Sequence, residues 1–351
     1  MIKLTGTLLF ILCFGSITLA QNAKLDWADS SAFSSNYSIG YSISESAGYI
    51  YEAGFYAQSI DLDPSSGAQV ENSNGQDDIY IRKLANDESL IWGLSIGGDL
   101  DETVSDINVD ANGDIVITGS FRDTVDFDPG VGVFELTTQS KALFILKLDN
   151  NGNFIWASAT DVTAFNVRAD ISFDNSNNII LSAGYQDSID FDFGPSVDMR
   201  YSSSVITGFV AKYTPTGNYL WAVEIEGANS TVLSTDVLIN DEIIAVGSFN
   251  GVADFDPGTG VLNESTGGSE DAFVWRLSSA GDLVWVKFLK SDESVRLNSV
   301  KLGDQDTLYL AGWYSDSVDF DPNAGEDILV SYTSNGGINY TNNVFVAKWT
   351  S

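Results

Sequence analysis

The sequence predicts an all-β protein made of five copies of one unit, and three observations support this fold class. One tryptophan recurs every 64 or 65 residues, at Trp27, Trp92, Trp156, Trp221 and Trp285. An aspartate repeats with the same period, at Asp61, Asp126, Asp190, Asp254 and Asp319. No segment holds a sustained 3.6-residue apolar period, whereas short extended runs are bounded by Asn-Gly pairs, which are typical of β-hairpins.

The second copy shows the order of elements within a unit. Residues 105–110 alternate in polarity, Asn112 and Gly113 form a turn, and residues 115–119 extend again. An excursion with the sequence VDFDPG follows at residues 125–130. Two more extended runs then flank a second Asn-Gly turn and end at Trp156. Four strands with a long excursion between the second and third are typical of a propeller blade, so we expect a five-bladed β-propeller.

The copy boundaries predict how the ring closes. The last third strand, residues 345–349, is followed by only two residues, and residues 24–27 resemble a fourth strand without its first three. We therefore expect the N-terminal strand to complete the last blade, which removes a free edge; an open array is the alternative. The predicted single domain, residues 21–351, divides into units 28–92, 93–156, 157–221, 222–285, and 286–351 plus 21–27.

The first twenty residues are predicted to be a signal peptide. Lys3 gives a basic start, residues 8–14 are apolar, and the small-residue site ends at Ala20, so Gln21 would begin the exported chain. The apolar run is too short to favour a membrane span, although a retained anchor is an alternative. We expect an extracellular or periplasmic protein with no membrane insertion after signal removal.

Composition excludes several classes of function. The 351 residues include 49 Asp+Glu, 16 Lys+Arg, one Cys and no His, with a net charge of −33. Without histidine there is no Ser-His-Asp or Cys-His nucleophile, and there is no His/Cys zinc site. The strong negative charge argues against nucleic acid as a partner. A protein or glycan ligand of unknown identity remains open.

The repeats resemble a known family. The strings IVITGSF at residues 115–121, VDFDPG at 125–130 and FVAKY at 209–213, continued by GNYLW at 217–221, are similar to SBBP-type β-propeller repeats. The resemblance covers nearly all of the chain beyond residue 20, although the family name implies seven blades and this chain has five copies. It implies a secreted or surface protein of Bacteroidetes type, and it implies no shared activity.

The most distinctive motif is a pair of aspartates separated by one residue. If the motif lies in a strand, both carboxylates point to one face, where repulsion costs about 1 kcal/mol in water and about 4 kcal/mol when partly shielded. Hard oxygen ligands suit Ca²⁺, so calcium is one interpretation. Solvated turn chemistry, balance by a nearby cation and the acid pair of a glycosidase are the others. The candidate calcium ligands, with a third carboxylate in three copies, are Asp61, Asp63, Asp123, Asp126, Asp128, Asp187, Asp190, Asp192, Asp254, Asp256, Asp316, Asp319 and Asp321.

Other repeated residues favour structural roles. The periodic tryptophans predict packing between blades rather than sugar stacking. A cation recurs in the third strand of each copy, at Lys83, Lys147, Lys212, Arg276 and Lys348, and predicts an ion pair within each blade; an anion-binding ring is the alternative. Residues 110–114 predict a hairpin turn rather than a calcium loop. Trp313 is not a repeated tryptophan, and it is the candidate ligand contact.

Two hypotheses on function follow. Similar copies favour a non-enzymatic module for binding or scaffolding, including a lectin-like carbohydrate binder with several equivalent loops. A glycoside hydrolase is the alternative, because two positioned carboxylates suffice for that reaction. The hydrolase needs acids that are not repeated, such as Glu224, Glu226 and Glu242, to meet in one place.

Overall fold

The computed structural model describes residues 37–65, 67–162, 168–321, 323, 325–331 and 342–350. These residues are β-strand and connecting loops throughout, apart from one short 3-10 helix at Asp304–Asp306. This confirms the all-β prediction. Within the same residues, no helix has the length and apolarity to cross a membrane.

Five antiparallel sheets follow one another along the chain, each made of strands that are consecutive apart from the excursions. The first holds β1 (Ser38–Ser46), β2 (Tyr49–Asp61), β3 (Val70–Ala85) and β4 (Leu90–Ile96). The second holds β5 (Thr103–Val109), β6 (Ile115–Phe121), β9 (Ala142–Leu148) and β10 (Phe154–Asp161). The third holds β11 (Asp170–Phe173), β12 (Ile179–Tyr185), β15 (Thr207–Tyr213) and β16 (Tyr219–Glu224).

The last two sheets continue the pattern. The fourth holds β17 (Asn229–Val237), β18 (Ile243–Asn250), β21 (Asp271–Leu277) and β22 (Leu283–Leu289). The fifth has three described strands, β23 (Ser294–Leu302), β24 (Leu308–Ser315) and β27 (Asn343–Trp349). Residues 1–36, with the predicted signal peptide and the closing strand, lie outside the described residues.

The excursions form small hairpins of their own. They lie between the second and third strands of their sheets, as β7 (Thr124–Asp126) with β8 (Glu135–Thr137), β13 (Ser188–Asp190) with β14 (Met199–Tyr201), β19 (Val252–Asp254) with β20 (Asn263–Ser265), and β25 (Ser317–Asp319) with β26 (Ile328–Val330). In the first sheet the equivalent residues extend β2 and β3 instead.

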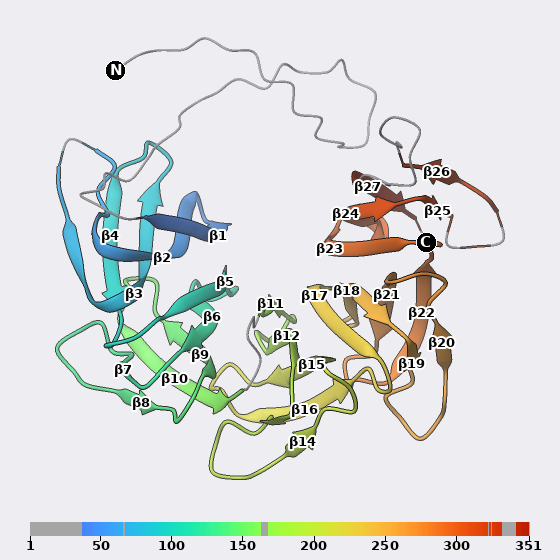
Figure 1. Cartoon of the computed structure of the whole chain (residues 1–351). Helices are drawn as coiled ribbons and strands as arrows, with labels where there is room; N and C mark the ends of the chain where they lie inside the picture. Colours follow the sequence, from blue (N-terminus) through green and yellow to red (C-terminus); the bar gives the residue numbers. More distant parts are fainter. Residues whose placement is uncertain are drawn as a thin grey trace.

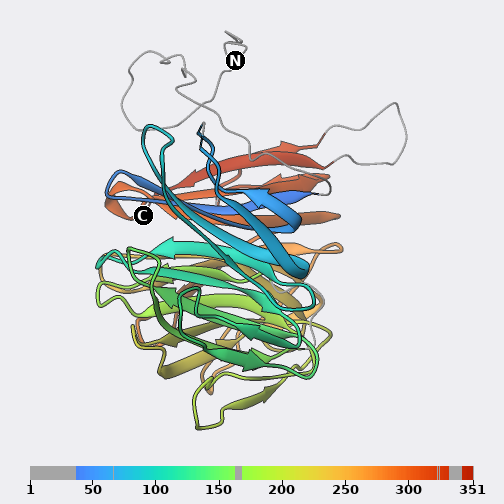
Figure 2. The ribbon, with the colours of Figure 1, turned by 90° about the vertical axis from the view of Figure 1, so that its left-hand side faces the viewer.

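The sheets are arranged side by side around a common centre (Figure 1). The first strand of each sheet is innermost, and β1, β5, β11, β17 and β23 contact one another in succession. The perpendicular view shows the sheets lying face against face (Figure 2). Among the described strands the series is open between the fifth sheet and the first.

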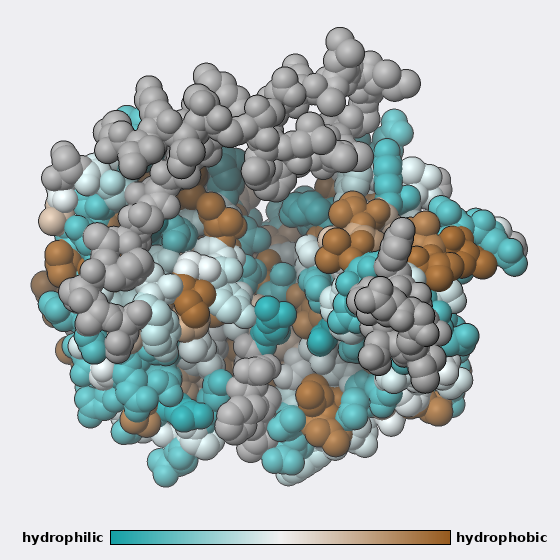
Figure 3. Space-filling model, turned by 45° about the horizontal axis from the view of Figure 1, so that its top comes forward, coloured by the Kyte–Doolittle hydropathy of each residue, from teal (hydrophilic) through white to brown (hydrophobic). Residues whose placement is uncertain are grey.

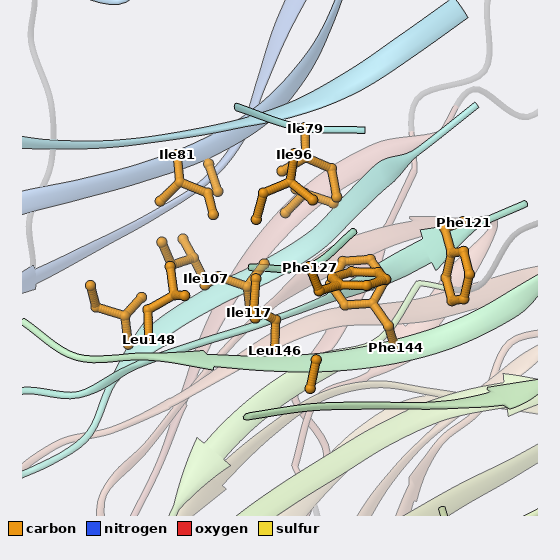
Figure 4. Close-up of a cluster of buried hydrophobic side chains, with 14 of the residues drawn as sticks. Ile79, Ile81, Ile96, Ile107, Ile117, Phe121, Phe127, Phe144, Leu146 and Leu148 are labelled. Atoms are coloured by element: carbon orange, nitrogen blue, oxygen red, sulfur yellow. The ribbon is translucent and has the colours of Figure 1, made fainter. Parts of the chain in front are cut away.

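The core lies between neighbouring sheets. All seven residues of β6 and of β9 are buried, because a sheet covers each of their faces, whereas the outermost strand β10 is only partly buried. The cluster between the first two sheets contains Ile79, Ile81, Ile107, Ile117 and Phe127 (Figure 4). Full burial of each such side chain stabilises the fold by roughly 1.5–3 kcal/mol.

Candidate functional site

The paired aspartates shape the loops that follow the short strands. Asp126 ends β7, and its Oδ1 accepts hydrogen bonds from the backbone N–H of Asp128 at 3.0 Å and of Phe134 at 2.8 Å. Asp128 Oδ1 accepts the N–H of Gly130 at 2.8 Å. The other four copies form the same set of bonds, through Asp61 and Asp63, Asp190 and Asp192, Asp254 and Asp256, and Asp319 and Asp321. One oxygen of every carboxylate in these pairs therefore holds the loop.

The expectation that both aspartates lie in a strand is wrong. The strand ends at the first aspartate of the pair, because its side chain accepts the N–H of the residue two positions on and so turns the chain. The apolar residues do alternate as expected: Val125 and Phe127 are buried, while the two carboxylates are half-buried.

The third carboxylate position is set by the backbone. Asp123, Asp187 and Asp316 all have positive φ, and so do Gln58 and Gly251 at the same position in the other copies. This tight turn brings the chain back to the excursion hairpin, where the carbonyl of Asp123 accepts the N–H of Thr138 at 2.9 Å. Aspartate tolerates the left-handed conformation better than most residues, which accounts for its presence here.

The donor set around these loops suits at most a weak metal site. No group of three or more Asp, Glu, His or Cys side chains is placed to hold a metal in the described residues. Ca²⁺ takes six to eight oxygen ligands, so an ion at one pair would draw the rest from backbone carbonyls and water. The calcium interpretation stays a prediction.

One aspartate pair borders a cavity. Asp190 and Asp192 line a space of about 520 Å³ between the second and third sheets, together with Asp161, Phe193 and Met199. The Asp161 carboxylate also accepts a hydrogen bond from the hydroxyl of Thr138. Carboxylates from two neighbouring sheets thus border the same space.

The repeated tryptophans pack between sheets, as predicted. Trp92 of the first sheet donates from Nε1 to the carbonyl of Asn150 at 3.2 Å, in a turn of the second sheet. Trp156 donates in the same way to the carbonyl of Pro215 in the third sheet. Each ring lies against the glycine of that turn, where a Cβ atom would come within 3.4 Å of it. Trp27 lies outside the described residues.

Three of the repeated cations pair with a carboxylate of their own sheet. Lys147 Nζ lies 2.8 Å from Asp110 Oδ2 and 3.2 Å from Asp114 Oδ2. Lys212 pairs with Asp174 at 2.8 Å and Arg276 with Glu242 at 2.5 Å, so the predicted ion pair forms in three copies.

Two copies depart from this pattern. Lys83 lies over the ring of Tyr49, 4.3 Å from its centroid, and also donates to Asn150. Lys348 lies 5.7 Å from the ring centroid of Tyr309. Among the described residues neither lysine forms an ion pair with a carboxylate, and an aromatic face lies beside each of them instead.

Residues 110–114 form the predicted hairpin turn. Asp110 Oδ1 accepts the N–H of Asn112 at 2.8 Å and of Asp114 at 3.0 Å, while Gly113 has φ of +87°. The other oxygen of Asp110 binds Lys147. Both oxygens are therefore used within the fold.

Among the unrepeated residues, Glu226 lies close enough to Glu224 to raise its pKa, whereas Trp313 and Glu242 have other surroundings. Trp313 is half-buried in β24, opposite Arg296 and Val344, and its role as a ligand contact stays a prediction. Glu224 accepts hydrogen bonds from Tyr185 and from Arg200, and burial raises its pKa. Glu242 binds Arg276 instead. Glu224 and Glu242 thus have different partners.

The inner strands are joined by acidic side chains. Asp106 accepts a hydrogen bond from Ser42 on one side at 2.6 Å and the N–H of Ile171 on the other at 2.9 Å. Asp170 accepts the N–H and hydroxyl of Thr235. Burial raises the pKa of Asp106 to about 6, and burial together with Asp106 raises the pKa of Asp170.

Sequence reasoning missed a cavity at the centre. It has a volume of about 570 Å³ and is lined by residues from all five repeat units, with Lys141, Arg168 and Arg296 among them. Figure 3 shows the molecule hollowed near its centre, within a mostly hydrophilic face. The sequence signal for this cavity is the scarcity of cations, which makes each unrepeated Lys or Arg a candidate site residue.

Comparisons with known proteins add one relative. No known protein family matches the chain. Over 267 residues, 66% of this chain, it is 23% identical to an uncharacterized WD repeat-containing protein of Acanthamoeba polyphaga mimivirus. The chain spans about a fifth of that relative's length, 19%. The likeness to a WD-repeat protein and the repeated β-sheets both indicate a propeller-type fold.

Proposed function

We propose that this chain is an exported, non-enzymatic binding module built as a five-bladed β-propeller of SBBP-type repeats. The observation that carries the proposal is the meeting of all five repeat units at one central cavity. The repeated residues are used for packing and loop structure, and Glu224 and Glu242 have separate partners. This arrangement favours binding over hydrolysis.

The fifth sheet supports closure by residues 21–27. Trp221 packs against the turn glycine Gly281 of the next sheet, as the two earlier tryptophans do against theirs. Trp285 instead borders a cavity of about 230 Å³, lined by Leu308 and Trp349 of the fifth sheet among others. A fourth strand placed beside β27 would bring the start of that strand near Trp285 and fill this space.

Closure has a direct test. Trp27→Ala removes the side chain that would pack in the closing strand, at a cost of about 3–5 kcal/mol if the strand is docked. We expect a lower melting temperature for this variant, with Asn22→Ala unchanged as the control. Equal melting temperatures for all three proteins would favour an open array.

The binding function itself is tested with the labelled full chain on glycan and protein arrays, beside hydrolysis assays on chromogenic glycosides. Saturable retention of a ligand without turnover is the expected result. Release of the chromophore at a rate that a Glu224→Gln variant abolishes would replace the binding module with a glycosidase.

Calcium binding by the aspartate loops is part of the same proposal. Its support is that each Asp126-type carboxylate has a second oxygen beyond the one that caps the loop, and hard oxygens suit Ca²⁺. Millimolar Ca²⁺ should raise the melting temperature above its value in chelator, and Asp126→Asn with Asp128→Asn should reduce the rise. Asp87→Asn, in an exposed turn, is the control. If Ca²⁺ has no effect on the melting temperature, these aspartates only stabilise the loops and do not bind the metal.

A further inference from the structure

The central cavity concentrates positive charge in a strongly negative protein. Lys and Arg make up 16 of 351 residues, and Asp and Glu make up 49. Of the eleven residues that line the cavity, three are cations and none is acidic. The cations come from three different repeat units: Lys141 precedes β9, Arg168 precedes β11, and Arg296 lies in β23.

The two guanidinium groups have unused hydrogen-bond donors. Arg296 Nε is buried and forms no hydrogen bond with any described residue, since its nearest carboxylate oxygen, on Glu270, is 3.7 Å away. That oxygen accepts a hydrogen bond from Ser248 instead. Arg168 donates from Nε to the hydroxyl of Tyr41 at 3.2 Å, and within the described residues its NH₂ groups have no partner.

The positive charges lie in a setting that strengthens the attraction of an anion. Burial, and next the guanidinium of Arg122, lower the pKa of Lys141 because both disfavour its charged form, while Asp101 acts in the opposite direction. A bound carboxylate would favour the charged form. Arginine presents a planar fork of donors that matches the two oxygens of a carboxylate.

The rest of the lining suits a hydroxylated ring. Tyr41, Ser105 and Thr231, which carry hydroxyl groups, line the same space. Tyr41 and Phe55 contact each other, with ring centroids 6.3 Å apart, and give the cavity an aromatic side. A volume of about 570 Å³ lies within the usual range for small-molecule sites.

A second, smaller cavity adjoins the first. It measures about 280 Å³ and shares Tyr41, Ser105 and Arg168 with the larger one. Asp106 and Asp170 line it, so hydroxyl groups entering this part would meet carboxyl acceptors. Cationic and acidic parts side by side fit a ligand that carries one carboxylate and several hydroxyls.

We propose that the central cavity binds a sugar acid, with the carboxylate held by Arg168 and Arg296 and the sugar hydroxyls directed toward Asp106 and Asp170. This inference rests on the proposed binding function and names its ligand class.

The test is calorimetric titration of the full chain with galacturonate and digalacturonate. Galactose is the neutral counterpart, and sulfate at equal ionic strength is the anion without a ring. We expect saturable binding of the uronates and none of galactose. Arg168→Gln and Arg296→Gln should each weaken uronate binding about tenfold or more, because a charge-assisted hydrogen bond contributes about 1.5–3 kcal/mol. Lys290→Gln removes an exposed cation outside the cavity and should leave the affinity unchanged.

Several outcomes would overturn the inference. Equal affinity for galacturonate and galactose would show that the carboxylate does not contribute to binding. Equal affinity for galacturonate and sulfate would show that the sugar ring does not contribute. An equal loss in Lys290→Gln would place binding elsewhere. Absence of uronate binding in a chain that still retains an array ligand would refute the sugar-acid site and leave the binding module standing. Melting curves for each variant show whether it is folded.

Discussion

Two buried carboxyl groups at the interface of the first and second sheets should make the stability of this protein fall as the pH rises. Glu102, which precedes β5, and Asp78 in β3 are both fully buried. Glu102 Oε2 accepts the N–H of Gly98 at 2.8 Å, and Asp78 Oδ2 accepts the N–H of Asn74 at 2.9 Å. Their other oxygens, Oε1 and Oδ1, have no partner within the described residues.

Burial raises the pKa of Glu102 to about 8 from the ordinary 4.5, and the charge of Asp78 adds to the shift. The folded chain therefore binds a proton that the unfolded chain has already released above pH 4.5. Stability is greatest below that pH and falls as the pH rises toward 8. The loss is at most on the order of 5 kcal/mol, at about 1.36 kcal/mol per pH unit.

Glu102→Gln separates this effect from packing. Glutamine keeps the shape and the acceptor for the Gly98 N–H, but it cannot ionise. We expect the variant to match the parent near pH 4.5 and to melt about 3–7 °C higher at pH 9, given an unfolding entropy of about 2 cal/mol/K per residue. Thermal melting from pH 4.5 to 9 is the measurement, with the exposed Glu135→Gln as the control. Parallel pH profiles for Glu102→Gln and the parent would refute the reasoning.

Three further predictions concern the repeated residues. Lys147→Met should destabilise the fold by about 3–5 kcal/mol, because it leaves the buried Asp110 carboxylate without its cation; adding Asp110→Asn should restore part of the loss in denaturant unfolding. Asp126→Ala should cost about 1 kcal/mol in chelator, whereas Asp126→Asn keeps the Oδ1 acceptor and should cost less; equal losses would contradict the loop-capping role. Gly152→Ala should lower the melting temperature, because φ is +82° and the new Cβ would lie 2.9 Å from the Leu94 side chain; an unchanged melting temperature would show that the turn adapts.

The repeated features could be predicted from the sequence because each occurs several times. Asn-Gly turns and buried middle strands follow from local pattern, and one tryptophan per period predicts contact with the next sheet. The orientation of the aspartate pair could not be predicted in the same way. Asp126 ends its strand by bonding the backbone of Asp128 and Phe134, and that competition between side chain and strand depends on the loop path.

The central cavity could not be predicted from the sequence, for a different reason. Its residues are far apart in the chain and occupy repeat positions where the copies differ. Arg296 pairs with Trp313 as Thr231 pairs with Ser248 and Thr103 with Ser120, so these three residues are structural equivalents of different chemistry. No local pattern reports that such residues meet at the centre of a ring.

This division between repeated and unrepeated positions predicts that stability and ligand affinity can be changed separately. Lys147→Met removes a buried ion pair from the framework, and the reduced stability should leave uronate affinity within about twofold at a temperature where the variant is folded. Arg296→Gln removes a half-buried cation whose only ion pair among the described residues is long, so stability should change by less than about 1 kcal/mol while affinity falls about tenfold. Denaturant unfolding and calorimetric titration of both variants give the four values needed. If Lys147→Met weakens uronate binding as much as Arg296→Gln does, the cavity is not separable from the framework, because its shape then depends on the ion pair within the second sheet.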